Sequence, residues 1–169
     1  MTDLEVEGQS MTLLEIIRRD YLRVLAEVGW DAERVAAVVH NTADQCPMPP
    51  GYEHLRLAPS PIQGQGLFTD RAIESGEVIG PARIDGKRTW LGRYANHSPW
   101  PNTEFRLLEN GDLEWVALED IAPGAEILNN YRQGASIWGA KFNPEEVART
   151  MTERDESLRR LAALQEAKA

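Results

Sequence analysis

Three short stretches of the chain carry residues whose types and spacing could do chemistry. The first, residues 60–68, contains two glycines, Gly64 and Gly66, which let a backbone turn tightly and approach a ligand closely. The second, residues 93–102, is crowded with side chains that donate and accept hydrogen bonds. The third, residues 117–131, is an apolar segment that ends in polar residues and Tyr131. Taken one at a time, each stretch also fits an ordinary turn or strand end.

Residue types alone leave the chemistry of these stretches open. A histidine such as His97 is more often structural than catalytic, and no nucleophile-elbow motif supports a serine triad that uses it. The three histidines, His40, His54 and His97, lack the spacing of metal ligands, so no metal site is predicted. The only cysteine, Cys46, lies in a proline-rich stretch, where a thiol is more often inert than nucleophilic.

The order and identity of the three stretches resemble the SET-domain family of S-adenosylmethionine-dependent protein lysine methyltransferases. Residues 64–68 match the opening glycine motif of that family, and residues 72–79 match the strand motif I-x-x-G-E-x-I. Residues 93–102 match R-[FY]-x-N-H-S-x-x-P-N at every fixed position. Residues 120–131 match D-I-x-x-G-E-E-I-x-x-x-Y except at Ala125. The resemblance covers residues 55–138, about half of the chain.

The resemblance implies a mainly β SET fold of small curved β-sheets, flanked here by N-terminal and C-terminal α-helices. In such a fold the C-terminal motif threads under a loop closed by the Asn-His motif and forms a pseudoknot, an exception to the general avoidance of threaded loops. The resemblance assigns Tyr131 as the catalytic residue, which closes the site and orients the reacting groups. It assigns to S-adenosylmethionine the residues Gln65, Gly66, Leu67, Arg93, Asn96, His97 and Trp138. Trp138 is the candidate for stacking on the adenine.

Methyl transfer to a lysine amine requires positioning and an unprotonated nitrogen. A free lysine with a pKa of about 10.4 must lose roughly 3.4 units to be half neutral at pH 7, which equals about 4.6 kcal/mol. A positive charge at about 4 Å repels an ammonium by roughly 4 kcal/mol at an effective dielectric constant near 20. The sulfonium charge of the cofactor is therefore large enough to favour the neutral amine, and no histidine or glutamate base is predicted.

Several features depart from the family pattern. The insert between Gly80 and Arg93 is very short, so we expect the helices outside the β-rich core to supply the missing wall of the substrate groove. The zinc-binding cysteines that often flank such domains are absent, and no second tyrosine follows Tyr131 to indicate how many methyl groups are added. A SET fold kept as a protein-interaction module without turnover is the alternative function.

The elements that must position these stretches divide the chain into three predicted parts: residues 1–50, 51–140 and 141–169. In the first, residues 10–40 predict two helices joined at Gly29, with a capping box at Thr12 and a proline-rich linker after Asn41. The apolar face predicted for the first helix comprises Leu13, Leu14, Ile17, Tyr21, Leu25 and Val28. The middle part predicts short strands and tight turns, including a hairpin at Asn110-Gly111. Residues 141–169 predict a C-terminal helix with a broken apolar stripe at Val147, Met151, Leu158 and Leu161.

The net charge limits the partners of this 169-residue chain. With 18 Lys and Arg against 27 Asp and Glu, the formal charge is -9, which disfavours binding to nucleic acid and favours a basic partner. Together with this charge, the SET resemblance implies a basic, lysine-bearing protein substrate. The two N-terminal helices also fit a helix-turn-helix, but residues 11–40 carry too few cations for phosphate contacts. We instead expect them to pack on the core or to form a homodimer through the terminal helices. No membrane segment or signal peptide is predicted, and a lone cysteine favours a cytoplasmic setting.

Overall fold

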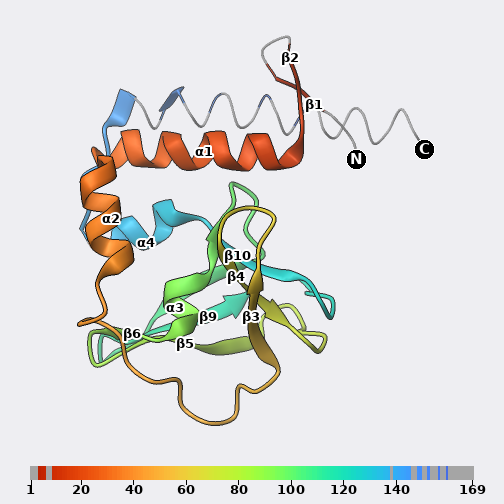
Figure 1. Cartoon of the computed structure of the whole chain (residues 1–169), viewed down its shortest axis with the longest axis vertical. Coiled ribbons are helices and arrows are strands. Elements are labelled where there is room, and N and C mark those ends of the chain that lie inside the picture. Colours follow the sequence, from red (N-terminus) through yellow and green to blue (C-terminus); the bar gives the residue numbers. More distant parts are fainter. Residues whose placement is uncertain are drawn as a thin grey trace.

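The computed structural model describes residues 4–6, 9–137, 139–145, 148, 149, 152, 156 and 159. Within this part of the chain, the strands form three β-sheets. Helix α1 lies across the top of the β-rich core in Figure 1, and α2 lies at its left. Of the helix predicted over residues 141–169, the described residues 144, 145, 148, 149, 152, 156 and 159 are helical. The predicted apolar positions Val147, Met151, Leu158 and Leu161 and the predicted adenine-stacking Trp138 lie outside the described residues.

Two N-terminal helices follow a short antiparallel pair of strands, β1 (Leu4–Val6) and β2 (Gln9–Met11). Helix α1 (Leu13–Val28) begins at a capping box in which Thr12 and Glu15 bond reciprocally, and it ends at Gly29 in the left-handed conformation. Helix α2 (Ala32–His40) begins at Asp31, whose side chain accepts from Arg34 N–H. The capping residues predicted from the sequence are confirmed.

The buried face of α1 differs from the predicted one. Its buried residues are Ile16, Ile17, Asp20, Val24 and Glu27, whereas the predicted Leu13 is exposed. The predicted Tyr21, Leu25 and Val28 are half-buried at the edge of this face. The carboxylates of Asp20 and Glu27 thus lie on the face of α1 that packs inward, because they meet charged and polar partners there. The hydrophobic pattern assigns acids to the exposed face, so it does not predict the burial of these two residues.

One four-stranded sheet has the order β6–β5–β9–β8. It consists of β5 (Val78–Ile84), β6 (Lys87–Arg88), β8 (Thr103–Leu107) and β9 (Leu113–Ala117), all paired antiparallel. The turn between β8 and β9 contains Asn110 and Gly111, which confirms the predicted hairpin. The sheet contributes Trp115, which is 1% exposed and whose ring stacks on Phe105 at 3.8 Å between centroids.

The other four-stranded sheet, of order β3–β4–β10–β7, joins the three chemically interesting stretches. Its strands are β3 (Leu55–Pro59), β4 (Gln65–Thr69), β7 (Asn96–His97) and β10 (Glu126–Asn129). Strand β10 pairs antiparallel with β4 and parallel with β7, so the third stretch lies between the first and the second. The predominance of strands agrees with the predicted mainly β fold, whereas the threading of a pseudoknot stays a prediction.

Two short helices flank β7 and β10. Helix α3 (Trp90–Tyr94) leads into β7, and helix α4 (Tyr131–Ile137) follows β10. The main hydrophobic core contains Leu55, Leu67, Ile73, Ile79, Ala82, Leu91, Ala95, Leu113, Trp115, Ala117, Ile121 and Ile127. The residues just before β7 and just after β10 therefore meet at the edge of a tightly packed core.

The segment predicted as a linker runs along this core. Gln45 forms a parallel bridge with Arg88 of β6, and Cys46 N–H donates to the Arg88 carbonyl at 2.9 Å. The boundaries 1–50, 51–140 and 141–169 stay predictions.

Candidate active site

Tyr131 forms hydrogen bonds through both its backbone N–H and its hydroxyl, to residues within and just before β7. Its backbone N–H donates to His97 Nδ1 at 3.2 Å, and its hydroxyl donates to the Ala95 carbonyl at 3.0 Å. Burial raises the pKa of the Tyr131 hydroxyl above its ordinary value of 10.0. The phenol therefore stays protonated at neutral pH and acts as a hydrogen-bond donor rather than as a base.

His97 has a ring whose two nitrogens have different partners. The ring is buried, with the residue 3% exposed, and Nε2 lies 2.8 Å from Asp20 Oδ2. Because Nδ1 accepts from Tyr131 N–H, Nε2 must carry the proton of the neutral ring and donate it to the Asp20 carboxylate. Burial lowers the pKa of His97 from 6.5, against the opposing effect of Asp20, so the imidazole is neutral at pH 7.

A buried charge cluster joins α1 to α4. Arg132 donates to both oxygens of Asp20 at 2.8 and 3.0 Å and to both oxygens of Glu27 at 2.7 and 2.9 Å. Glu27 is 1% exposed and Asp20 is 3% exposed. Burial opposes the ionisation of Asp20, but the hydrogen bonds from His97 and Arg132 prevail and hold its pKa far below 3.8. Burial likewise disfavours the charge on Arg132, yet Asp20 and Glu27 raise its pKa.

The neutral state of His97 predicts how stability changes with pH. Since its folded pKa lies below the unfolded value of about 6.5, the unfolded chain binds more protons below that pH and folding weakens as the pH falls. We expect the free energy of unfolding to be flat from about pH 8 to 7 and to fall by up to about 1.4 kcal/mol per pH unit below about 6.5. Urea unfolding between about pH 5 and 8 measures this, because the contribution of Asp20 to stability changes only at lower pH, from its unfolded pKa of about 3.9 downwards.

His54 also has a pKa lowered by burial, so a His54→Asn variant isolates the contribution of His97. The charged or titratable groups around the His97 ring are Asp20, Arg132, Glu27, Tyr131 and Tyr21. Stability in His54→Asn that stays constant or rises from about pH 7 to 5 would contradict a neutral, buried His97.

The glycine stretch and the Asn-His motif also come together. Asn96 Nδ2 lies within hydrogen-bond distance of the Gln63 carbonyl at 3.2 Å, the Gln65 carbonyl at 3.3 Å and Glu126 Oε1 at 2.8 Å. In β4, only Leu67 and Phe68 pair with β10. The Asn96 amide therefore contacts β4 at Gln65, just before this pairing begins. A Cβ on Gly66 would lie 2.2 Å from Glu126 Oε1, so the glycine makes room for the carboxylate that Asn96 contacts.

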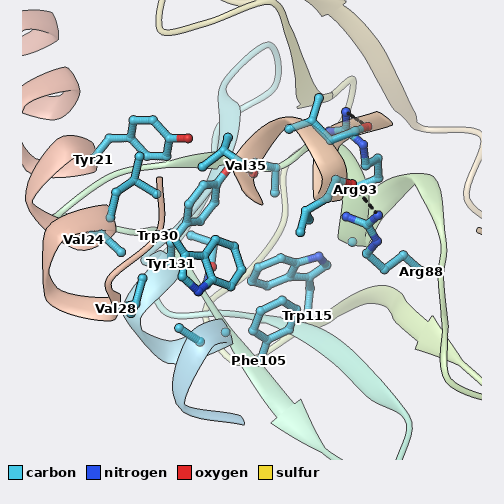
Figure 2. Close-up of a pocket in the computed structure, with 18 residues that line it drawn as sticks. Tyr21, Val24, Val28, Trp30, Val35, Arg88, Arg93, Phe105, Trp115 and Tyr131 are labelled. Atoms are coloured by element: carbon cyan, nitrogen blue, oxygen red, sulfur yellow. Dashed lines mark hydrogen bonds between the residues drawn. The ribbon is translucent and has the colours of Figure 1, made fainter. Parts of the chain in front are cut away.

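A cavity of about 170 Å³ lies between the N-terminal helices and the core. Figure 2 shows Tyr131, Tyr21 and Trp30 on one side of it and Arg93 and Arg88 on the other. The Tyr21 ring meets the Tyr131 ring edge-on at 5.9 Å between centroids. Of the described residues that line the cavity, none carries a carboxylate, so its walls are aromatic, aliphatic and cationic.

Arg93 faces this cavity rather than the glycine stretch. Its Nη2 donates to the Val39 carbonyl of α2 at 2.9 Å, and its guanidinium lies over the Tyr94 ring. Its Nε is buried and has no hydrogen-bond partner among the described residues. A buried donor without a partner in a cavity wall is suited to a ligand that brings an acceptor, such as a carboxylate.

The structure thus brings most of the predicted site residues into two connected groups. Gln65, Gly66 and Leu67 lie in β4 beside the Asn96 amide, although the Leu67 side chain belongs to the core. Arg93, His97 and Tyr131 surround Ala95. The sequence reasoning missed four charged residues that surround the site without lining the cavity, which are Asp20, Glu27, Glu126 and Arg132. The available indication was two acids seven residues apart on the inward face of a predicted helix.

Among the described residues, no group of three or more histidine, cysteine, aspartate or glutamate side chains is placed to hold a metal ion. No described helix is long and apolar enough to cross a membrane.

Comparison with known proteins gives one family. A family model for the SET domain matches residues 80–132, which contain the Asn-His motif and end just after Tyr131. No curated protein matches the chain.

Solved structures similar to this chain include chains of polycomb repressive complex 2. The crystal structure of the Chaetomium thermophilum complex has 21% identity and a TM-score of 0.41, and the match covers 46% of this chain and 15% of that chain. A humanized mutant of the same complex bound to an inhibitor has 21% identity and a TM-score of 0.40, covering 46% and 14%. An active complex in the stimulated state has 20% identity and a TM-score of 0.38, covering 46% and 15%. The chain spans only this small share of those longer chains, and its resemblance to the SET-domain family is carried by the match over residues 80–132.

Proposed function

We propose that this chain is an S-adenosylmethionine-dependent methyltransferase that acts on a protein lysine side chain. The observation that carries the proposal is Tyr131, which lies in the cavity wall within the segment that matches the SET domain and is pinned at its N–H and its hydroxyl. A tyrosine fixed in this way can orient a reacting group with little loss of freedom at the moment of reaction.

The residues at the site fit S-adenosylmethionine at two points. The unpaired Nε of Arg93 in the cavity wall suits the carboxylate of the cofactor, and the rings of Tyr21 and Tyr131 suit its purine. The residues that would hold it are Gln65, Gly66, Leu67, Arg93, Asn96 and His97, with Trp138 as a further candidate. When bound, the cofactor supplies a methyl group whose bond to sulfur breaks as the lone pair of the amine nitrogen forms the new C–N bond.

The chain itself favours the neutral amine that this reaction needs. A lysine inserted into the cavity would leave water and would meet the guanidinium of Arg93 but no lining carboxylate, while the other lining guanidinium, that of Arg88, is paired with Asp44. Burial alone lowers the pKa of a lysine by up to about 3–5 units, and about 3.4 units are needed at pH 7. Because the Tyr131 phenol stays protonated, the amine loses its proton to solvent before it enters and not to this tyrosine.

The substrate of the proposed enzyme is a basic, lysine-bearing protein segment. The chain has a formal charge of -9, which attracts such a segment at long range. Helices α1 and α2 line the cavity opposite the core, where relatives carry a longer insert than residues 80–93 provide. We assign to these helices the wall of the substrate groove.

An interaction module without turnover is the second candidate. The observation that favours it is the Asn96 amide, whose donors already have three acceptors within the chain. A bound cofactor would have to use the backbone there, or displace one of these bonds.

Titration calorimetry with S-adenosylmethionine, together with tritiated-methyl transfer to lysine-rich basic proteins, separates the two candidates. The methyltransferase predicts saturable binding that is weakened in Arg93→Met, and radioactivity in the protein substrate. As a control, Arg56→Met removes an arginine whose partner, Asp70, is on the exposed surface, and it should bind as wild type does. Binding of cofactor without any transfer, or no binding at all, would favour the module.

A further inference from the structure

Helix α1 lies outside the segment that matches the SET domain, yet it contacts all three chemically interesting stretches. Near its start, Arg18 donates from Nε to the Ile62 carbonyl at 3.2 Å and from Nη2 to the Pro61 carbonyl at 3.1 Å, just before the glycine turn. Its middle reaches the Asn-His motif, and its end reaches α4 directly after Tyr131. Through these side-chain contacts, α1, which lies across the top of the β-rich core in Figure 1, forms part of the surroundings of the site.

Asp20 is the residue of α1 that joins these contacts. Its Oδ2 accepts from His97 Nε2 and from Arg132 Nη1, both at 2.8 Å, while its Oδ1 accepts from Arg132 Nη2 at 3.0 Å. The Glu27 carboxylate accepts from the same guanidinium, whereas the His97 ring bonds to Asp20. Asp20 thus binds both the His97 ring and the Arg132 guanidinium, and the Glu27 carboxylate binds the same guanidinium.

We propose that Asp20 is a positioning residue for Tyr131, acting through His97. By accepting the Nε2 proton, Asp20 fixes the tautomer in which Nδ1 is unprotonated. Only that tautomer accepts the backbone N–H of Tyr131. Asp20 therefore holds one end of Tyr131 while the Ala95 carbonyl holds the other.

The burial of Asp20 supports a role beyond packing. A carboxylate that is 3% exposed costs desolvation energy, and an apolar side chain would pack a helix against a core without that cost. An apolar residue at position 20, however, would leave His97 Nε2–H buried without an acceptor. The Asp20 carboxylate supplies the hydrogen-bond acceptor that the buried imidazole N–H requires and that a leucine at this position would not provide.

The first test uses the wild-type chain alone and does not depend on methyl transfer. Nitrogen-15 NMR of the His97 ring at pH 7 should show a protonated Nε2 and an unprotonated Nδ1. A ring with the proton on Nδ1, or a ring protonated on both nitrogens, would overturn the proposal.

The second test compares Asp20→Asn with Glu27→Gln. Each variant removes one carboxylate charge from Arg132 with little change in volume, and only Asp20→Asn touches His97. The new amide offers one oxygen to two donors, so we expect the Nε2–H fraction of His97 to fall in Asp20→Asn and to stay as in the wild type in Glu27→Gln.

The kinetic part of the test rests on the proposed function. In Asp20→Asn we expect kcat to fall by about tenfold to a hundredfold with KM for the protein substrate nearly unchanged, because a misplaced group costs rate more than binding. An equal loss in Glu27→Gln, or an unchanged His97 ring in Asp20→Asn, would assign Asp20 a merely structural role. If the wild-type chain transfers no methyl group, the proposed function fails while the NMR comparison still decides the role of Asp20.

Discussion

Replacing Tyr131 with phenylalanine is expected to lower the rate of methyl transfer by about a hundredfold or more while leaving the chain folded. The proposed function makes the phenol the group that orients the reacting atoms, and removing one such preorganised donor typically costs about 10²- to 10³-fold in kcat. The ring and its contacts with His97 and Tyr21 stay in place. The lost hydrogen bond to the Ala95 carbonyl should cost only about 1 kcal/mol of stability. Tritiated-methyl transfer under single-turnover conditions measures the rate.

Tyr52→Phe is the matched control for this substitution. Tyr52 packs against the core beside Gly80 and is not among the residues that line the cavity, so its hydroxyl should be dispensable for transfer. If Tyr131→Phe transferred methyl groups at the wild-type rate, the assignment of Tyr131 as the catalytic residue would be wrong.

Replacing Arg132 with methionine is expected to destabilise the chain by about 3–5 kcal/mol, the largest effect on stability that we predict. The substitution leaves the two buried carboxylates of Asp20 and Glu27 without the guanidinium that both of them contact. Because only one buried group is removed, the desolvation cost of the remaining charges is no longer offset. Urea unfolding at pH 7 gives the change in free energy.

Arg56→Met provides the comparison for an exposed pair. Arg56 Nε lies 2.6 Å from Asp70 Oδ1, with side chains that are 44% and 53% exposed, so its loss should cost at most about 1 kcal/mol. Similar losses in the two variants would show that the charges around Arg132 are screened by solvent as those on the surface are.

Local features of the sequence predicted the elements well. The capping box at Thr12, the left-handed Gly29 and the Asn110-Gly111 hairpin each depend on residues within a few positions of one another. The same holds for the motifs: the order of the glycine, Asn-His and Tyr131 stretches in the sequence indicates the SET family, whose model matches the part that contains the last two.

The charged part of the site could not be predicted in this way. Asp20 lies 112 residues from Arg132 and 77 residues from His97, and the two acids seven residues apart on α1 do not by themselves identify these partners. A hydrophobic pattern assigns acids to the exposed face, so it rotates the helix until Leu13 points inward. The correct rotation depends on a guanidinium that the fold brings to this face from the far end of the chain. Arg93 illustrates the same limit, because its contact with Val39 depends on where α2 comes to lie.

The most direct test of the account is mass spectrometry of lysine residues in proteins from cells that express either the wild-type chain or Tyr131→Phe. The account predicts added mass in steps of about 14 Da on lysines of basic proteins in the presence of the wild type, and their loss with the variant. Adducts that are equally abundant with both forms, or absent with a wild-type chain that binds S-adenosylmethionine, would contradict it.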